Sequence, residues 1–205
     1  MNRRELLKMI AVLTGGVVVG GEVFLTGCKT GANTEVGFTP GNIALLDEVG
    51  ETILPATSSP GAKAAKVGEF MKVFVNDCYT EPDQQAFIAG LSEIEESCKK
   101  MHNKSFMDCT PQERHDFLLT LEKESKEYNF KRDQPDDTQD EQAEDEKKAP
   151  VKKPVHYYSM MKQLTLLGYF TSEIAATKAM RHNPVPGKYD GAFPYKKGDK
   201  AFADS

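Results

Sequence analysis

The sequence lacks tryptophan altogether and has no surplus of basic residues. Lys and Arg number 26 against 31 Asp and Glu, so the formal net charge is −5. A chain of this charge offers no extended basic face, and we therefore expect no binding to nucleic acid. Its four cysteines form no CxxC pair and no CxxCH, which argues against a zinc site of the usual spacing and against an attached c-type haem.

The sequence also lacks the motifs of the common enzyme classes. It contains no GxGxxG, no Walker loop, no GxSxG and no HExxH. The four histidines fall on different predicted elements: His102, His115, His156 and His182. Tyr157 and Tyr158 could donate hydrogen bonds to a quinone, but aromatic residues on a helix more often pack in a core or an interface. We assign no catalytic, cofactor-binding or metal-binding residue.

Residues 1–28 have the pattern of an export signal. A positively charged start precedes an apolar run from Met9 to Val19, which is shorter than the roughly 20 residues of a membrane-spanning helix. Arg3 and Arg4 resemble the paired arginines of the twin-arginine motif, which directs the export of folded proteins. A general secretory signal also needs a positive start, so both export routes stay open.

The signal ends in a candidate lipid attachment site. The tetrapeptide LTGC, which ends at Cys28, resembles a bacterial lipobox, whose cysteine is acylated and becomes the mature N-terminus. Two or three acyl chains hold a protein stably at a membrane surface. The expected mature protein is an exported lipoprotein on the periplasmic face of a membrane, inner or outer, with residues 29–37 as a polar tether.

Helical periodicity predicts an all-α fold, an irregular bundle of about five helices, within a domain over residues 38–191. The expected core positions recur at steps of three and four: Ile43, Leu46, Val49 and Ile53; Val67, Phe70, Phe74 and Cys78; Phe87, Leu91, Ile94, Cys98 and Met101; Phe117, Leu118 and Leu121; Met160, Leu164, Leu167 and Ile174. Thr39 with Pro40 and the capping box at Thr110 predict two of the helix starts. The last helix should end near His182, since Asn183-Pro184 cannot continue it.

Two segments are expected to stand outside the packed helices. Residues 131–154 are almost devoid of apolar side chains, so this acidic insert should be disordered, as its burial could not offset the ordering entropy. Residues 192–205 carry aromatics without periodicity and should form an extended tail. The calcium-binding spacing of an EF-hand is absent from the insert.

The cysteines leave one question open. If Cys28 carries lipid, three thiols remain, and Cys98 and Cys109 flank a short connection. They could form a disulfide in an oxidising compartment. Alternatively, all three are small apolar residues of helices.

Two signatures at opposite ends of the domain carry a family resemblance. ILPATSSPGA at residues 53–62, and LTLLGYFTSE at residues 164–173 followed by NPVPGKYDG at residues 183–191, resemble the signatures of the gluconate 2-dehydrogenase subunit 3 family. These proteins are small accessory subunits of membrane-associated flavoprotein dehydrogenases. The resemblance implies a large FAD-dependent sugar or alcohol dehydrogenase as partner, often with a cytochrome c subunit. FAD would be bound by that partner and no cofactor by this chain.

The implied role is that of a non-catalytic subunit, which assists export, assembly and membrane attachment of the flavoprotein. The interface with that partner should be aromatic and apolar at its centre. We expect it at Tyr169, Phe170, Pro186, Gly187, Tyr189 and Phe193. The alternative is a stand-alone envelope lipoprotein that binds a ligand or acts as a scaffold. A third possibility is an enzyme that acts alone, but we expect the isolated chain to show no dehydrogenase activity with an artificial acceptor.

Overall fold

The computed structural model describes residues 37–134, 153–183, 185, 187 and 190–203, and it confirms the all-α fold class. The described part contains five α-helices: α2 (Pro40–Ile53), α3 (Val67–Cys78), α4 (Glu81–His102), α5 (Pro111–Asp133) and α6 (Tyr157–Phe170). Shorter elements connect or follow them: the 3₁₀ turns η1 (Lys63–Ala65) and η2 (Phe106–Asp108), the π-helical turn η3 (Ala175–Ala179), and the strands β1 (Arg181–His182) and β2 (Phe202–Ala203). None of the described helices has the length and apolar character needed to cross a membrane. The export signal, Cys28 and most of the acidic insert lie outside the described residues.

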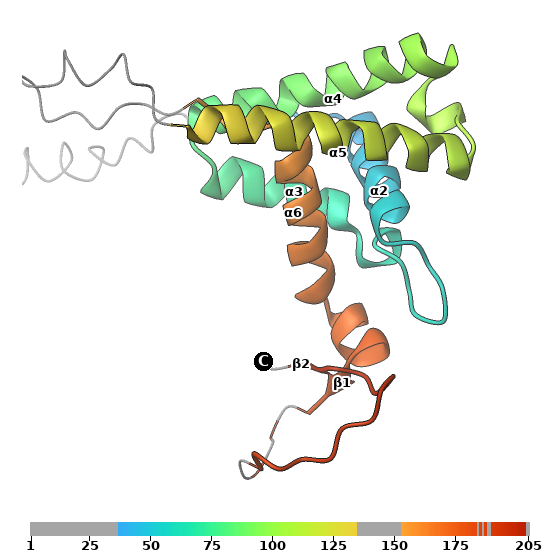
Figure 1. Cartoon of the computed structure of the whole chain (residues 1–205), viewed down its shortest axis with the longest axis vertical. Coiled ribbons are helices and arrows are strands. Elements are labelled where there is room, and N and C mark those ends of the chain that lie inside the picture. The colour runs from blue at the N-terminus through green and yellow to red at the C-terminus, as the bar shows by residue number, and fades with distance from the viewer. Residues whose placement is uncertain (1–36, 135–152, 184, 186, 188–189, 204–205) are drawn as a thin grey trace, which may run out of the picture. The chain divides into compact units, whose positions relative to one another are not determined.

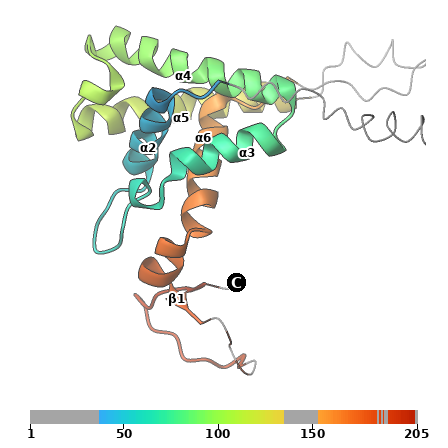
Figure 2. The same ribbon diagram turned by 180° about the vertical axis from the view of Figure 1, so that it is seen from behind.

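The bundle is organised around α6, which contacts each of the other four α-helices. α4 and α5 form a long antiparallel hairpin, and α6 runs across it with α2 and α3 beside it (Figures 1 and 2). Because α6 is surrounded, it buries more than one face. Its buried residues are Tyr157, Tyr158, Met160, Met161, Leu164, Thr165, Gly168 and Tyr169.

The last helix is shorter than the sequence predicted. α6 ends at Phe170 rather than near His182. Two side-chain hydroxyls donate hydrogen bonds to backbone carbonyls of its last turn. Thr171 Oγ1 donates to the Leu167 oxygen at 2.7 Å, and Ser172 Oγ donates to the Tyr169 oxygen at 2.6 Å. Such side chain to backbone bonds compete with helix continuation. The expected core position Leu167 is also wrong, since its side chain is 39% exposed.

The buried face of α3 differs from the predicted one as well. Met71 and Val75, which were not predicted, are fully buried together with the predicted Val67. The predicted Phe70 and Phe74 are partly buried and pack against the core, whereas Cys78 is exposed. The helix starts only after η1 and Lys66, whose φ of 54° is left-handed. Met101 of α4, also predicted as core, is 48% exposed.

Helix caps appear where the sequence predicted them. Thr39 Oγ1 accepts from the Asn42 amide at 3.2 Å, at the start of α2. The capping box of α5 is complete: Glu113 N donates to Thr110 Oγ1, and Thr110 N donates to the Glu113 carboxylate. That backbone bond and the nearby Lys104 ammonium lower the pKa of Glu113 to about 2. At its other end α5 continues through Asp133, so the predicted start of the disordered insert at Lys131 is too early.

His156 caps α6 through its ring. Nδ1 accepts from the Tyr158 amide at 3.2 Å, and the ring stacks on Tyr157 with a centroid distance of 4.4 Å. Burial lowers the pKa of His156 below its ordinary value, against the opposing charges of Glu93 and Glu124. The neutral ring is the form that can accept this bond.

A pH dependence of stability follows from this cap. The unfolded chain binds a proton at His156 at a higher pH than the folded chain does, so the free energy of unfolding should fall as pH decreases from about 7.5 through the folded pKa. We expect His156→Asn, which supplies a cap that does not titrate, to lose less stability over this range. Urea unfolding of both proteins at several pH values measures the difference. Parallel curves would contradict the prediction, since all other titrating groups are shared.

Candidate functional site

The first signature forms a loop that carboxylates of α2 hold in place. Glu51 Oε1 accepts from the Ala56 amide at 2.8 Å, and Oε2 accepts from the Lys63 amide at 2.9 Å. A Cβ on Gly61 would lie 2.3 Å from Glu51 Oε1 and 2.6 Å from the Ala56 nitrogen. The loop therefore needs glycine at this position, because no side chain fits between the carboxylate and the backbone. Asp47 accepts from the Gly68 amide at 2.8 Å and so holds the first turn of α3 in the same way.

The second signature meets this loop in space. Tyr169 Oη donates to the carbonyl oxygen of Pro60 at 2.7 Å, across 109 positions of the sequence. A Cβ on Gly168 would lie 2.6 Å from the Phe70 ring, so α6 and α3 approach closely at this point. The two signatures that carry the family resemblance therefore form one structural unit, which we call the signature junction (Pro60, Gly61, Gly168 and Tyr169).

The bond from Tyr169 predicts a measurable contribution to stability. Tyr169→Phe keeps the ring but leaves the Pro60 carbonyl without its donor, which should cost about 1–2 kcal/mol. The midpoint of urea unfolding should fall, and amide exchange should accelerate in residues 56–62. Tyr195→Phe serves as the matched control, because Tyr195 is 75% exposed. Equal midpoints for the two variants would show that the junction bond adds no stability.

A cavity of about 390 Å³ opens beside the junction, between η1 and η3. It is lined by Ala64, Ala65, Lys66, Ser172, Glu173, Ile174, Thr177 and Lys178. These side chains include neither a histidine nor a cysteine, and the charged ones are of both signs. The lining combines small apolar side chains with hydroxyl and charged ones.

An arm extends from η3 to the end of the described chain. β1 and β2 pair in parallel, with Arg181 opposite Phe202. The Arg181 guanidinium lies 5.6 Å from the centroid of Phe193 and 4.8 Å from that of Phe202, and the two rings make an edge contact at 5.4 Å. We call this cluster the aromatic arm (Arg181, Phe193 and Phe202). Such cation–π contacts hold the rings together although they face solvent.

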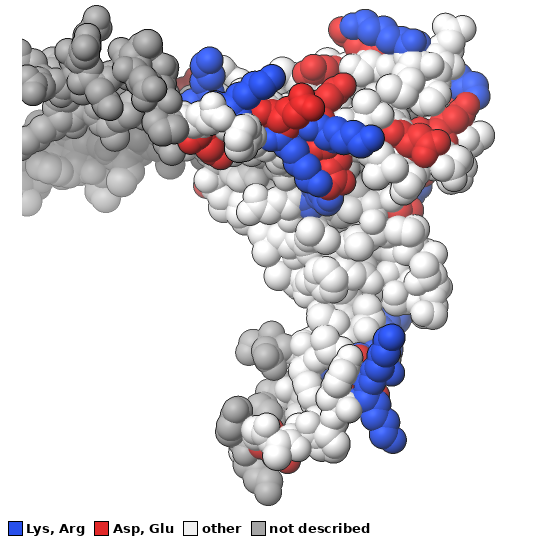
Figure 3. Space-filling view, viewed as in Figure 1, with Lys and Arg blue, Asp and Glu red and all other residues white. Residues whose placement is uncertain are grey.

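The arm exposes large apolar side chains. Phe193 is 51% exposed and Phe202 is 42% exposed. Nearby in the sequence, Val185 is 79% and Tyr195 is 75% exposed. Figure 3 shows charged side chains crowded over α5, few charges over the C-terminal part of α6, and basic side chains again at the arm. Apolar groups that stay exposed in this way mark candidate interaction sites.

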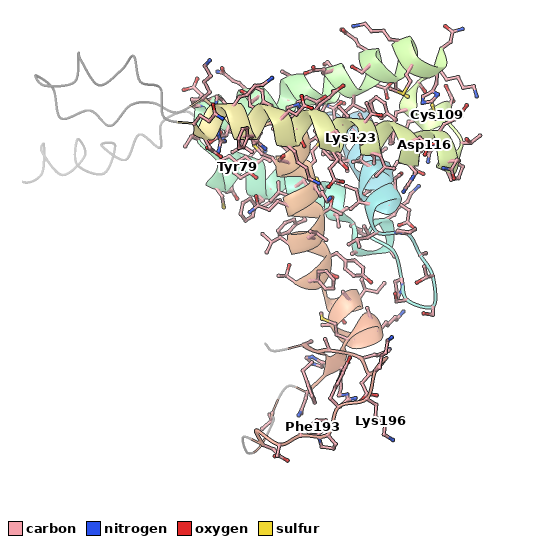
Figure 4. All side chains as sticks on the ribbon, viewed as in Figure 1. Tyr79, Cys109, Asp116, Lys123, Phe193 and Lys196 are labelled. Carbon is pink, nitrogen blue, oxygen red and sulfur yellow. The ribbon has the colours of Figure 1, made fainter. Side chains whose placement is uncertain are left out.

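The structure describes four of the six expected interface residues. Phe170 and Phe193 are about half exposed and are available to a partner; Figure 4 shows Phe193 on the arm, away from Lys123 of α5. Tyr169 is only 5% exposed, so the expectation of an exposed ring there is wrong. The ring is buried because the Tyr169 hydroxyl donates a hydrogen bond to the Pro60 carbonyl oxygen. Gly187 is exposed and has a φ of 77°, in the left-handed region that favours glycine.

The remaining predicted residues cannot be placed: Pro186, Tyr189, Arg3, Arg4 and Cys28 lie outside the described residues. Sequence reasoning missed Arg181 and Phe202. The only local signal was the presence of aromatic residues in a polar tail. The contact between Arg181 and Phe202 could not be predicted, because the pairing of β1 with β2 joins segments some 20 positions apart.

The histidines do not converge in the described part of the chain. His115 is exposed beside Asp116, His156 caps α6 and His182 belongs to β1. His102 is partly buried, and its Nε2 has no hydrogen-bond partner there. No set of three or more His, Cys, Asp or Glu side chains within residues 37–134, 153–183 and 190–203 is arranged to hold a metal ion.

Comparison with known proteins identifies the family. The model of the family described as gluconate 2-dehydrogenase subunit 3 matches residues 40–187, which include the signature junction. No match was found among the curated proteins or the solved structures. The matched region covers most of the chain and all five described α-helices. The chain belongs to the gluconate 2-dehydrogenase subunit 3 family.

Proposed function

We propose that this chain is a non-catalytic small subunit of a membrane-associated FAD-dependent sugar or alcohol dehydrogenase. Its role is to assist export, assembly and membrane attachment of the flavoprotein, which holds the FAD and the substrate. The observation that carries the proposal is the family match over residues 40–187. A cytochrome c subunit would take the electrons from the flavoprotein.

The contacts described above support a docking role. The signature junction rigidifies the α6 end of the bundle, and exposed rings follow it on Phe170 and on the aromatic arm. Rigid aromatic residues lose little conformational entropy on binding and are frequent at the centre of interfaces. The charged surface over α5 would then face solvent.

The export signal explains why docking must be tight. A flavoprotein acquires FAD when it folds, and a folded protein without its own signal can cross a membrane only while bound to a partner that has one. Arg3 and Arg4 would supply the twin-arginine signal, and an acylated Cys28 would keep the complex at the periplasmic face of the membrane.

Co-purification tests the proposal. The full chain, tagged at its C-terminus and expressed with the flavoprotein of the same genome, should be recovered from detergent-solubilised membranes with a subunit that shows flavin absorbance. Dehydrogenase activity with an artificial acceptor should reside in the complex and be absent from the small subunit alone. Recovery of a colourless lipoprotein would favour the stand-alone scaffold, and activity of the isolated subunit would favour an enzyme.

Two signal variants separate the proposed roles. Replacement of Arg3 and Arg4 by lysine should leave the flavoprotein in the cytoplasm, whereas Cys28→Ser should release an exported complex from the membrane. Cell fractionation and immunoblotting of both subunits measure each outcome. Normal export of the flavoprotein with the lysine variant would overturn the escort role.

A further inference from the structure

Two buried thiols are in contact at the turn between α4 and α5. Cys98 Sγ lies 3.3 Å from Cys109 Sγ, although the residues are eleven positions apart. Cys98 is fully buried and Cys109 is 5% exposed, whereas Cys78 is exposed at the end of α3. Figure 4 places Cys109 at the end of the α4–α5 hairpin. Both cysteines are free in this structure.

The turn that brings the thiols together is ordered by independent contacts. Asn103, with a φ of 56°, ends α4, and Phe106 is fully buried. Arg114 of α5 donates to the Phe106 carbonyl at 3.0 Å, and Lys104 pairs with Glu113 at 3.1 Å. The distance between the two sulfur atoms is therefore set by an ordered turn that contacts both helices.

We propose that Cys98 and Cys109 form a structural disulfide that joins α4 to α5 when the chain meets a disulfide donor. A bonded pair needs a sulfur separation of about 2.05 Å, so the sulfurs must approach by little more than 1 Å. The inference concerns the packing of this chain alone and is independent of the proposed function.

The reaction is a thiol–disulfide exchange with a donor such as a protein disulfide oxidase or oxidised glutathione. One protein thiolate attacks the donor disulfide and forms a mixed disulfide, which releases one donor thiol. The second protein sulfur then attacks the first and displaces the other donor thiol. Two S–H bonds are lost and one S–S bond forms in the protein, while the donor gains both electrons and both protons.

A structural role fits better than a redox-catalytic one. Catalytic cysteines are partly exposed and have lowered pKa values. Burial, together with the neighbouring Cys109, raises the pKa of Cys98 to about 12. A disulfide at this place would be shielded from reductants once the hairpin has closed over it.

Intact-mass and peptide analysis of the full chain provides the test. After equilibration with oxidised glutathione, the monomer should lose about 2 Da, apart from the mass of any glutathione bound at Cys28 or Cys78. Cys98 and Cys109 should resist alkylation under denaturing conditions. Combined cleavage after Lys or Arg and after Glu separates Cys78 from the pair, since Glu81, Glu93 and Glu96 lie between Cys78 and Cys98. It should yield fragment 97–99 linked to fragment 105–113.

Thermal unfolding provides a second readout. The oxidised protein should melt roughly 5–10 °C above protein that was reduced in denaturant and refolded in dithiothreitol, because the bond restricts the unfolded chain. Cys98→Ala and Cys109→Ala should abolish both the linked peptide and this reductant-dependent shift. Cys78→Ala, the matched control, should retain both. Full alkylation of Cys98 and Cys109 after oxidation, or a linked peptide with equal melting temperatures in the presence and absence of reductant, would overturn the proposal.

Discussion

Gly90→Ala should destabilise the bundle by about 3 kcal/mol, although alanine is the better helix former. An added Cβ on Gly90 of α4 would lie 2.2 Å from Tyr157 Cγ, 2.4 Å from Tyr157 Cβ and 2.5 Å from Tyr157 Cδ2. The Cβ of Tyr157 is fixed to the backbone of α6, so the ring cannot simply rotate away. The two helices would have to separate at the start of α6, and the packing of α6 against its neighbours would loosen.

Gly41→Ala is the matched control for this substitution. Gly41 also lies in a helix, but an added Cβ there would meet only Thr39 Oγ1, at 3.6 Å. We expect Gly41→Ala to leave stability unchanged or to raise it by up to about 1 kcal/mol. Thermal melting should show a loss of roughly 6–12 °C for Gly90→Ala and none for Gly41→Ala. Similar melting temperatures for the two variants would mean that α4 and α6 are not packed as closely as the structure shows.

The sequence predicted the helices whose limits depend on local chemistry. Thr39 with Pro40, and the Thr110 capping box, act on their own first turns, so neighbouring residues suffice to read them. The stripe Phe87, Leu91 and Ile94 is buried as expected because α4 has one face toward the core. Periodicity is informative when a helix is half buried.

Periodicity failed where tertiary contacts decide the orientation of a helix. α6 is surrounded by four helices, so burial of Met161 and Tyr169 does not follow one stripe. Gly90 and Gly168 permit close approach of Tyr157 and Phe70, and a glycine in a helix does not reveal from sequence which ring will cover it. These contacts are long-range, which explains why the helices were predicted better than their faces.

The candidate docking site was predicted only in part, for a similar reason. Aromatic composition selected Phe170 and Phe193, which are about half exposed, and an interface at these rings stays a prediction. It could not distinguish them from Tyr169, whose hydroxyl is bound by Pro60 more than 100 positions away. The role of Arg181, which contacts the rings of the arm, could not be predicted from the sequence, because these contacts depend on the pairing of β1 with β2.

The aromatic arm leads to the prediction with the largest effect on partner binding. Phe193→Ser combined with Phe202→Ser removes two rings that are already held together, at 5.4 Å from each other, and that lose little entropy on docking. If the arm contacts the flavoprotein, the dissociation constant should rise roughly 30-fold or more, which corresponds to about 2 kcal/mol. Binding of the variant and the parent to the purified flavoprotein can be compared by biolayer interferometry.

Phe130→Ser distinguishes a specific docking surface from general loss of exposed apolar area. Phe130 is 69% exposed but belongs to α5 and not to the aromatic arm, so it should not contact the partner. Its substitution should leave the dissociation constant within about twofold of the parent, since surface changes away from an interface have small effects. The melting temperature should stay the same in both variants, because all three rings are largely outside the core. An unchanged affinity of the double variant, or an equal loss in Phe130→Ser, would place the partner elsewhere on the bundle, and the junction-proximal ring of Phe170 would be the next position to substitute.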